Sequence, residues 1–165
     1  MITTTKLTTL SIAFLFVGSS LFLTNCKKDD KDPDPAPSGP AQSNTQRLTG
    51  KNFKLTALTI SPSILGLSNY YAQVPDCEKD DLIRFDTPDI FKKDAGSVKC
   101  DPNEVQTKTG TWTWNTNETI ITITMDGDSQ SWTVTKNDGT TLKVKYTEQI
   151  NGTNYTLTAT FVKQG

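Results

Sequence analysis

Alternation of apolar and polar residues from Thr109 to the C-terminus constrains the fold most strongly. Successive side chains of a β-strand point to opposite faces, so this period of two predicts strands with one buried face. The opposite positions are mostly Thr and Lys, and β-branched threonine suits a solvated sheet surface. The apolar positions are Trp112, Trp114, Ile121, Ile123, Met125, Trp132, Val134, Leu142, Val144, Tyr146, Tyr155, Leu157, Ala159 and Phe161.

Turn-forming residues separate these runs. They are Asn115-Thr116-Asn117, Asp126-Gly127, Asp138-Gly139 and Asn151-Gly152. Asn, Asp and Gly tolerate the positive φ that tight hairpins require. The pattern therefore predicts an antiparallel meander with strands of about seven or eight residues.

The N-terminal half adds fewer regular strands. Alternation of Phe53, Leu55 and Ala57 with polar residues predicts a strand within 48–60, and Leu82-Ile83-Arg84-Phe85 predicts another. A third is expected between Phe91 and Cys100. The total of about eight strands predicts an all-β, up-and-down antiparallel barrel, because closure removes exposed sheet edges. The segment 61–76 is too long for a hairpin turn and is predicted to form a short helix or lid.

The first 26 residues resemble a bacterial lipoprotein signal. Lys6 precedes an apolar stretch, 7–23, and Leu23-Thr24-Asn25-Cys26 stands in place of a lipobox, although Asn25 is not the usual small residue. Residues 1–25 would then be removed and Cys26 lipidated. Two alternatives are a membrane-spanning helix, for which about seventeen interrupted residues fall short of the usual ~20, and an ordinary secretory signal, which would leave a free thiol.

The residues after Cys26 predict an address and a tether. Lys27-Lys28-Asp29-Asp30 resembles the signal that directs lipoproteins of the Bacteroidota to the outer face of the outer membrane; the alternative is a solvated charge run. Residues 26–45 are rich in Asp, Ser and Pro, which favours an extended spacer. The predicted domains are 1–25 (signal), 26–45 (lipidated cysteine and tether) and 46–165 (barrel). The expected location is the bacterial outer membrane, exposed at the cell surface.

Composition excludes several classes of function. The formal charge is −1 and no basic stripe is present, so no nucleic-acid partner is predicted. The chain contains no histidine, which removes the commonest general base and zinc ligand. We expect no catalysis, metal or cofactor, and a monomer.

The three cysteines are expected to have two different roles, one for Cys26 and another for Cys77 and Cys100. If Cys26 carries lipid, Cys77 and Cys100 remain in an oxidising compartment and are predicted to form a disulfide, which would stabilise the fold by roughly 3 kcal/mol. The alternative, a redox or metal pair, lacks the C-x-x-C spacing.

Several short motifs resemble the lipocalin-like domains of bacterial surface lipoproteins. They are Leu48-x-Gly50-x-x-Phe53, Asp76-Cys77-x-x-Asp80-Asp81 followed by Phe85, Cys100, and Gly110-Thr111-Trp112. The lipocalin Gly-x-Trp pattern is not met, because residue 52 is Asn and the aromatic residue comes one position later, so Trp112 is expected to serve as the plug at the barrel base. The resemblance implies a barrel that binds a small apolar or amphipathic molecule.

Aromatic residues on the inward face are the candidate site. Trp112, Trp114, Trp132, Tyr146 and Phe161 either line a ligand cavity or fill the barrel with their own bulk. A ligand cavity would make the protein a membrane-anchored binding module for a small lipophilic ligand. A filled barrel would instead contact glycans or envelope proteins through its loops.

An acidic cluster and a single arginine are predicted to have structural roles. The cluster of Asp76, Glu78, Asp80 and Asp81 is predicted to form a solvated loop beside the disulfide, with calcium binding as the alternative. Arg84 is predicted to face outward, with Ile83 and Phe85 facing the core.

Overall fold

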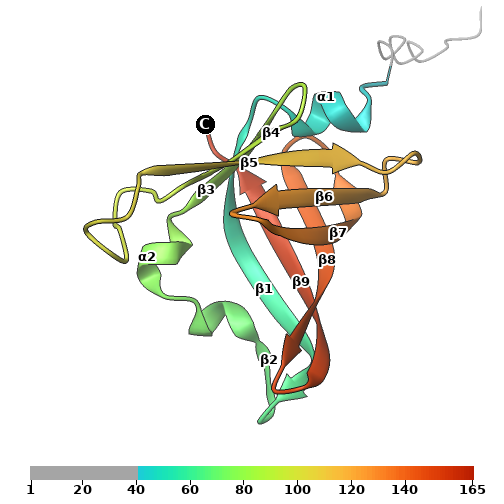
Figure 1. The fold of residues 1–165 in the computed structure, drawn as a ribbon. Coiled ribbons are helices and arrows are strands. Elements are labelled where there is room, and N and C mark those ends of the chain that lie inside the picture. The colour runs from blue at the N-terminus through green and yellow to red at the C-terminus, as the bar shows by residue number, and fades with distance from the viewer. Residues whose placement is uncertain (1–40) are drawn as a thin grey trace, which may run out of the picture. The chain divides into compact units, whose positions relative to one another are not determined.

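A closed antiparallel β-barrel forms the folded part of the chain. The computed structural model describes residues 41–165, so the predicted signal, Cys26 and most of the predicted tether lie outside the described residues. A nine-stranded sheet curls until β1 pairs with β9. The short strand β2 is an appendage of β1, and the other eight strands close the barrel (Figure 1). The prediction of an eight-stranded up-and-down barrel is confirmed.

The elements follow one another with short connections. They are α1 (Asn44–Leu48), β1 (Asn52–Ile64), β2 (Leu67–Asn69), the 3₁₀ helix η1 (Tyr70–Gln73), α2 (Asp76–Lys79), β3 (Leu82–Asp86), β4 (Ile90–Asp94), β5 (Thr107–Trp114), β6 (Ile120–Met125), β7 (Asp128–Asn137), β8 (Thr141–Ile150) and β9 (Thr153–Lys163). Ser43 and Gln46 form a capping box at the start of α1. No helix within 41–165 is long and apolar enough to cross a membrane.

Two of the four predicted hairpin turns have positive φ at both predicted residues, whereas in the β5–β6 turn the positive φ falls on Glu118 (51°), outside Asn115-Thr116-Asn117. Positive φ occurs at Asp126 (56°) and Gly127 (93°), and again at Asn151 (50°) and Gly152 (80°). These pairs connect β6 to β7 and β8 to β9, as expected for turns that match the twist of the strands.

The segment predicted as a helix or lid is more varied than expected. β1 continues through it to Ile64, and a tight turn at Leu65 (φ 50°) and Gly66 leads into β2 before η1 begins. The sequence did not indicate this hairpin, because leucine rarely adopts positive φ. The helical part of the prediction corresponds to η1.

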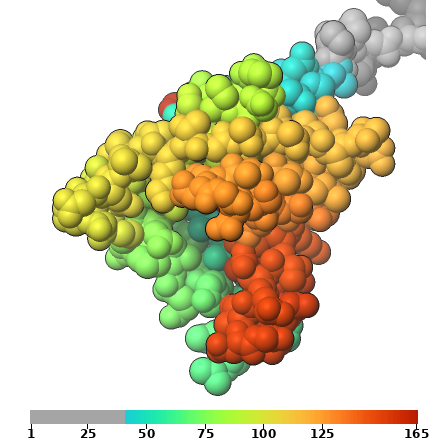
Figure 2. Space-filling view, in the orientation of Figure 1, coloured from blue at the N-terminus to red at the C-terminus, as the bar shows by residue number. Residues whose placement is uncertain are grey.

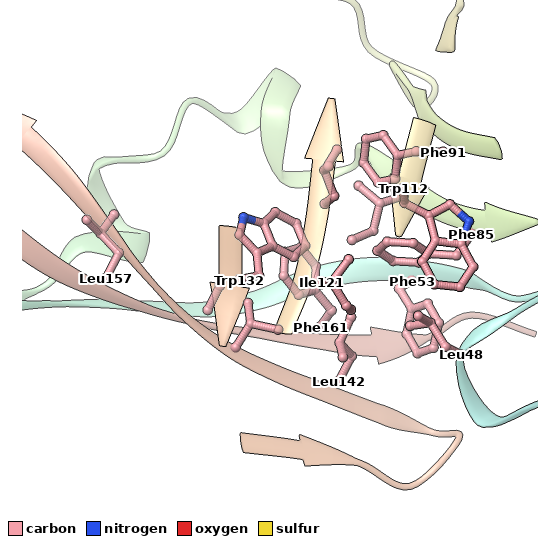
Figure 3. Close-up of a cluster of buried hydrophobic side chains, with 14 of the residues drawn as sticks. Leu48, Phe53, Phe85, Phe91, Trp112, Ile121, Trp132, Leu142, Leu157 and Phe161 are labelled. Carbon is pink, nitrogen blue, oxygen red and sulfur yellow. The ribbon is translucent and has the colours of Figure 1, made fainter. Parts of the chain in front are cut away.

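One end of the barrel is closed by packed side chains. Leu48, Phe53 and Phe85 are fully buried, and the ring of Phe85 lies 5.2 Å from Phe91 and 5.5 Å from Trp112, centroid to centroid. The indole Nε1 of Trp112 donates a hydrogen bond to the carbonyl oxygen of Asp86 at 3.0 Å. Figure 3 shows these rings at one end of the buried cluster, with Leu157 at the other. We call this packed region the closed end.

Gly110 is required by close approach of two strands. A Cβ at this position would overlap the carbonyl oxygen of Thr124 in β6. The glycine of the Gly110-Thr111-Trp112 motif therefore allows β5 to lie close against β6 just before Trp112 enters the core.

The disulfide prediction is confirmed. Cys77 in α2 bonds to Cys100 in the β4–β5 loop, with their Cα atoms 5.2 Å apart. Asp80 strengthens the same connection, because one carboxylate oxygen accepts hydrogen bonds from the backbone N–H and hydroxyl of Ser97, each at 2.7 Å. The side-chain hydrogen bond from Ser97 lowers the pKa of Asp80.

Charged residues of this region have structural partners. Arg84 pairs with Asp86 at 2.7 Å, while Ile83 and Phe85 are buried, as predicted. In the acidic cluster, Asp76 pairs with Lys79 at 2.8 Å. Between residues 41 and 165, no group of three or more His, Cys, Asp or Glu residues is arranged to hold a metal ion.

Candidate functional site

An open pocket occupies the half of the barrel beyond the closed end. Its volume is about 1170 Å³. Figure 2 shows the molecule hollowed between β6–β7, the segment 70–80 and β8–β9, with β1 at the base of the recess. The apolar side chains on its wall come from seven strands and from the segment joining η1 to α2. They are Leu55, Leu58, Val74, Ile83, Phe91, Ile123, Met125, Trp132, Tyr146 and Phe161.

The pocket forms because β1 and β3 separate. Their ladder contains only the pairs from Asn52↔Arg84 to Lys54↔Leu82, whereas β1 pairs with β9 from Phe53 to Ser61. The widening gap is bordered by η1, whose residue Tyr71 donates a hydroxyl hydrogen bond to the carbonyl oxygen of Leu55 at 3.4 Å. We call residues 70–79, which contain η1 and α2, the lid segment.

A second separation occurs between β7 and β8. Their ladder reaches Thr133↔Lys145 and stops there. Beyond it, side chains connect the two strands: the amide of Gln130 donates to the carboxylate of Glu148, and the indole Nε1 of Trp132 donates to Oε1 of Gln130 at 2.6 Å. This polar bridge spans the wall of the pocket.

Three stacked rings form the aromatic part of the wall. Trp132 lies 5.6 Å from Phe161 and 6.0 Å from Tyr146 between ring centroids, at interplanar angles of 17° and 25°. Burial, and secondarily the charge of Glu148, raises the pKa of Tyr146 to about 12. The phenol therefore stays neutral at physiological pH and offers ring surface and a hydroxyl to a ligand.

The structure divides the five predicted site residues between two regions. Trp132, Tyr146 and Phe161 line the pocket. Trp112 and Trp114 lie toward the closed end, where their rings make an edge-on contact at 6.1 Å. Nε1 of Trp114 is buried without a hydrogen-bond partner among the described residues. Filling of the barrel by its own side chains, the alternative left open by the sequence, describes the closed end alone.

A β-bulge in β1 changes which residues face the pocket. Pairing with β9 shifts between Leu55 and Ala57. As a result Leu58 and Ile60 are buried, so the alternation of Phe53, Leu55 and Ala57 predicts the strand but does not mark its buried face beyond Leu55. A bulge inserts one residue and reverses the parity of everything beyond it.

Other pocket residues were not singled out from the sequence. Gln130 and Glu148 occupy the inward parity of β7 and β8, two positions from Trp132 and Tyr146 respectively, so alternation could have identified them. Val74 carries no such signal, because it lies in an irregular segment.

Comparison with protein families places the fold. A model described as a lipocalin-like domain matches residues 48–144. This range includes the closed end and most strands that line the pocket. The search of curated proteins finds no match. A lipocalin-like barrel indicates a binding module for small hydrophobic ligands. Because this family model matches more than half of the chain and the fold is an eight-stranded barrel, the chain belongs to the lipocalin-like domain family.

Proposed function

We propose that the chain is a non-catalytic binding module whose open pocket holds a small apolar or amphipathic molecule. The observation that carries this proposal is an aromatic-walled cavity of about 1170 Å³, which exceeds the ~300 Å³ at the lower end of known ligand sites. Ligand burial against Trp132, Tyr146 and Phe161 would supply most of the binding free energy without any chemical step.

Probe titration tests the pocket. The full chain should bind the uncharged dye N-phenyl-1-naphthylamine saturably, with quenching of tryptophan fluorescence. Trp132→Leu should weaken the affinity about tenfold, because a large aromatic contact surface is lost.

Trp114→Leu is the matched control for this titration. It makes the same chemical change outside the pocket and should leave the affinity for the dye unchanged. Absence of saturable binding to the full chain, or equal losses in the two variants, would contradict the assignment of the site.

We further propose that Cys26 anchors the barrel to the outer membrane and that the segment after it directs display at the cell surface. The support is the lipobox-like Leu23-Thr24-Asn25-Cys26 and the adjoining Lys27-Lys28-Asp29-Asp30. Such an anchor would hold the pocket near a surface where lipophilic molecules partition.

Fractionation tests the anchor. Cys26→Ala should move the protein from the membrane fraction of the bacterial envelope into a soluble fraction, because the acyl chains supply the membrane affinity. Cys26→Ser serves as a second variant of similar size. Persistent membrane association of both would show that another feature anchors the chain.

A further inference from the structure

Charge around the pocket is unevenly distributed. Its lining contains five carboxylate residues against two lysines. Two of the carboxylates are already paired: Asp81 with Lys93 at 2.9 Å, and Asp126 with Lys108 at 3.2 Å. Glu78, Asp128 and Glu148 remain without an ion pair in the described part of the chain, against one lysine of the lining, Lys145.

Glu148 is the carboxylate positioned at the aromatic wall. The amide of Gln130 donates to one of its oxygens and fixes its place across the β7–β8 separation. Its charge reaches the Tyr146 hydroxyl, where it contributes to the raised pKa. In the described part of the chain no ion pair neutralises Glu148, so a negative charge lies beside the rings of the pocket.

Both lysines of the lining are poorly placed for an anionic ligand. Lys93 is engaged by Asp81. Lys145 is exposed and belongs to the alternating set of β8 that faces away from the core, between the buried Val144 and the pocket residue Tyr146. A ligand carboxylate lying against Tyr146 would thus lie on the same face of β8 as Glu148 and on the opposite face from Lys145.

We propose that the pocket selects cationic amphiphiles, with the apolar tail against the aromatic wall and an ammonium group beside Glu148 and the ring of Tyr146. The face of an aromatic ring attracts ammonium groups electrostatically. The negative charge of the Glu148 carboxylate adds a second electrostatic attraction for the ammonium group. This inference rests on the proposed function, because it assigns a headgroup to the ligand of the same pocket.

Three probes built on a ten-carbon chain separate headgroup from tail. The full chain is titrated with decyltrimethylammonium, decanol and decanoate, each below its aggregation concentration, and binding is followed by calorimetry. Decyltrimethylammonium should bind about tenfold more tightly than decanol, a gain that a partly exposed ion pair and a cation–π contact together can supply. Decanoate should bind most weakly.

Substitutions of Glu148 identify the source of the preference. Glu148→Gln keeps an acceptor for Gln130 and should remove most of the advantage of decyltrimethylammonium over decanol, leaving only the cation–π contribution of Tyr146, with the affinity for decanol unchanged. Glu148→Lys should shift the preference toward decanoate. Asp89→Asn, the matched loss of one charge on the β3–β4 turn away from the pocket lining, should leave all three affinities unchanged.

The outcomes distinguish the two proposals. If decanol binds but the cation shows no advantage, or if the advantage survives Glu148→Gln undiminished, the headgroup inference is overturned and the apolar pocket stands. If none of the three probes binds, the proposed function fails with it.

Discussion

Phe85→Ala should lower the free energy of unfolding by about 3–5 kcal/mol, the loss measured when large buried aromatic residues are truncated. Phe85 is fully buried, and its ring contacts those of Phe91 and Trp112 at the closed end. Truncation would leave a cavity that β3, β4 and β5 cannot collapse to fill, because each of these strands pairs with a neighbour on both sides.

Urea denaturation of the full chain, followed by tryptophan fluorescence, measures this loss. Phe85→Leu should cost clearly less, since most of the apolar volume is kept. Val98→Ala, an exposed truncation in the β4–β5 loop, should change stability by less than about 0.5 kcal/mol. A loss below about 1 kcal/mol for Phe85→Ala would contradict the close packing described for the closed end.

Removal of the disulfide by Cys77→Ser together with Cys100→Ser should cost about 3 kcal/mol, because the unfolded chain regains the freedom of the loop that the bond closes. The bond spans a sequence separation of 23 and attaches the lid segment to the loop before β5. Without it, Asp80 and its hydrogen bonds to Ser97 must hold the connection.

Reduction provides the control for this second prediction. Dithiothreitol should lower the unfolding free energy of the parent chain by a similar amount and leave the double variant unaffected. Equal stability of oxidised and reduced parent protein would show that the bond adds nothing to the fold.

Alternation predicted much of this architecture because the strands between residues 109 and 165 bury one face each. Leu142 and Val144 are fully buried in β8 while Lys143 and Lys145 are exposed. Turn-forming residues predicted the hairpins correctly where Asp126-Gly127 and Asn151-Gly152 adopt positive φ. In both cases a local rule matches what the tertiary structure requires.

The position of each inward side chain along the barrel axis could not be predicted from the sequence. Trp112 and Trp132 have the same inward parity, yet one lies at the closed end and the other on the pocket wall. Height along the axis depends on strand tilt and stagger, which single-strand periodicity does not record. The bulge after Leu55 could not be predicted either, because an extra residue in one strand is recognised only when that strand is aligned with its pairing partner.

The short β1–β3 ladder and the early end of the β7–β8 ladder give the barrel two seams beside the pocket. Hydrogen exchange should therefore be slow at the closed end and faster along the seams, where opening breaks few backbone bonds. Opening along the seams would leave the hydrogen-bonded strands of the closed end paired. The width of the pocket would then be able to change at a free-energy cost below that of global unfolding.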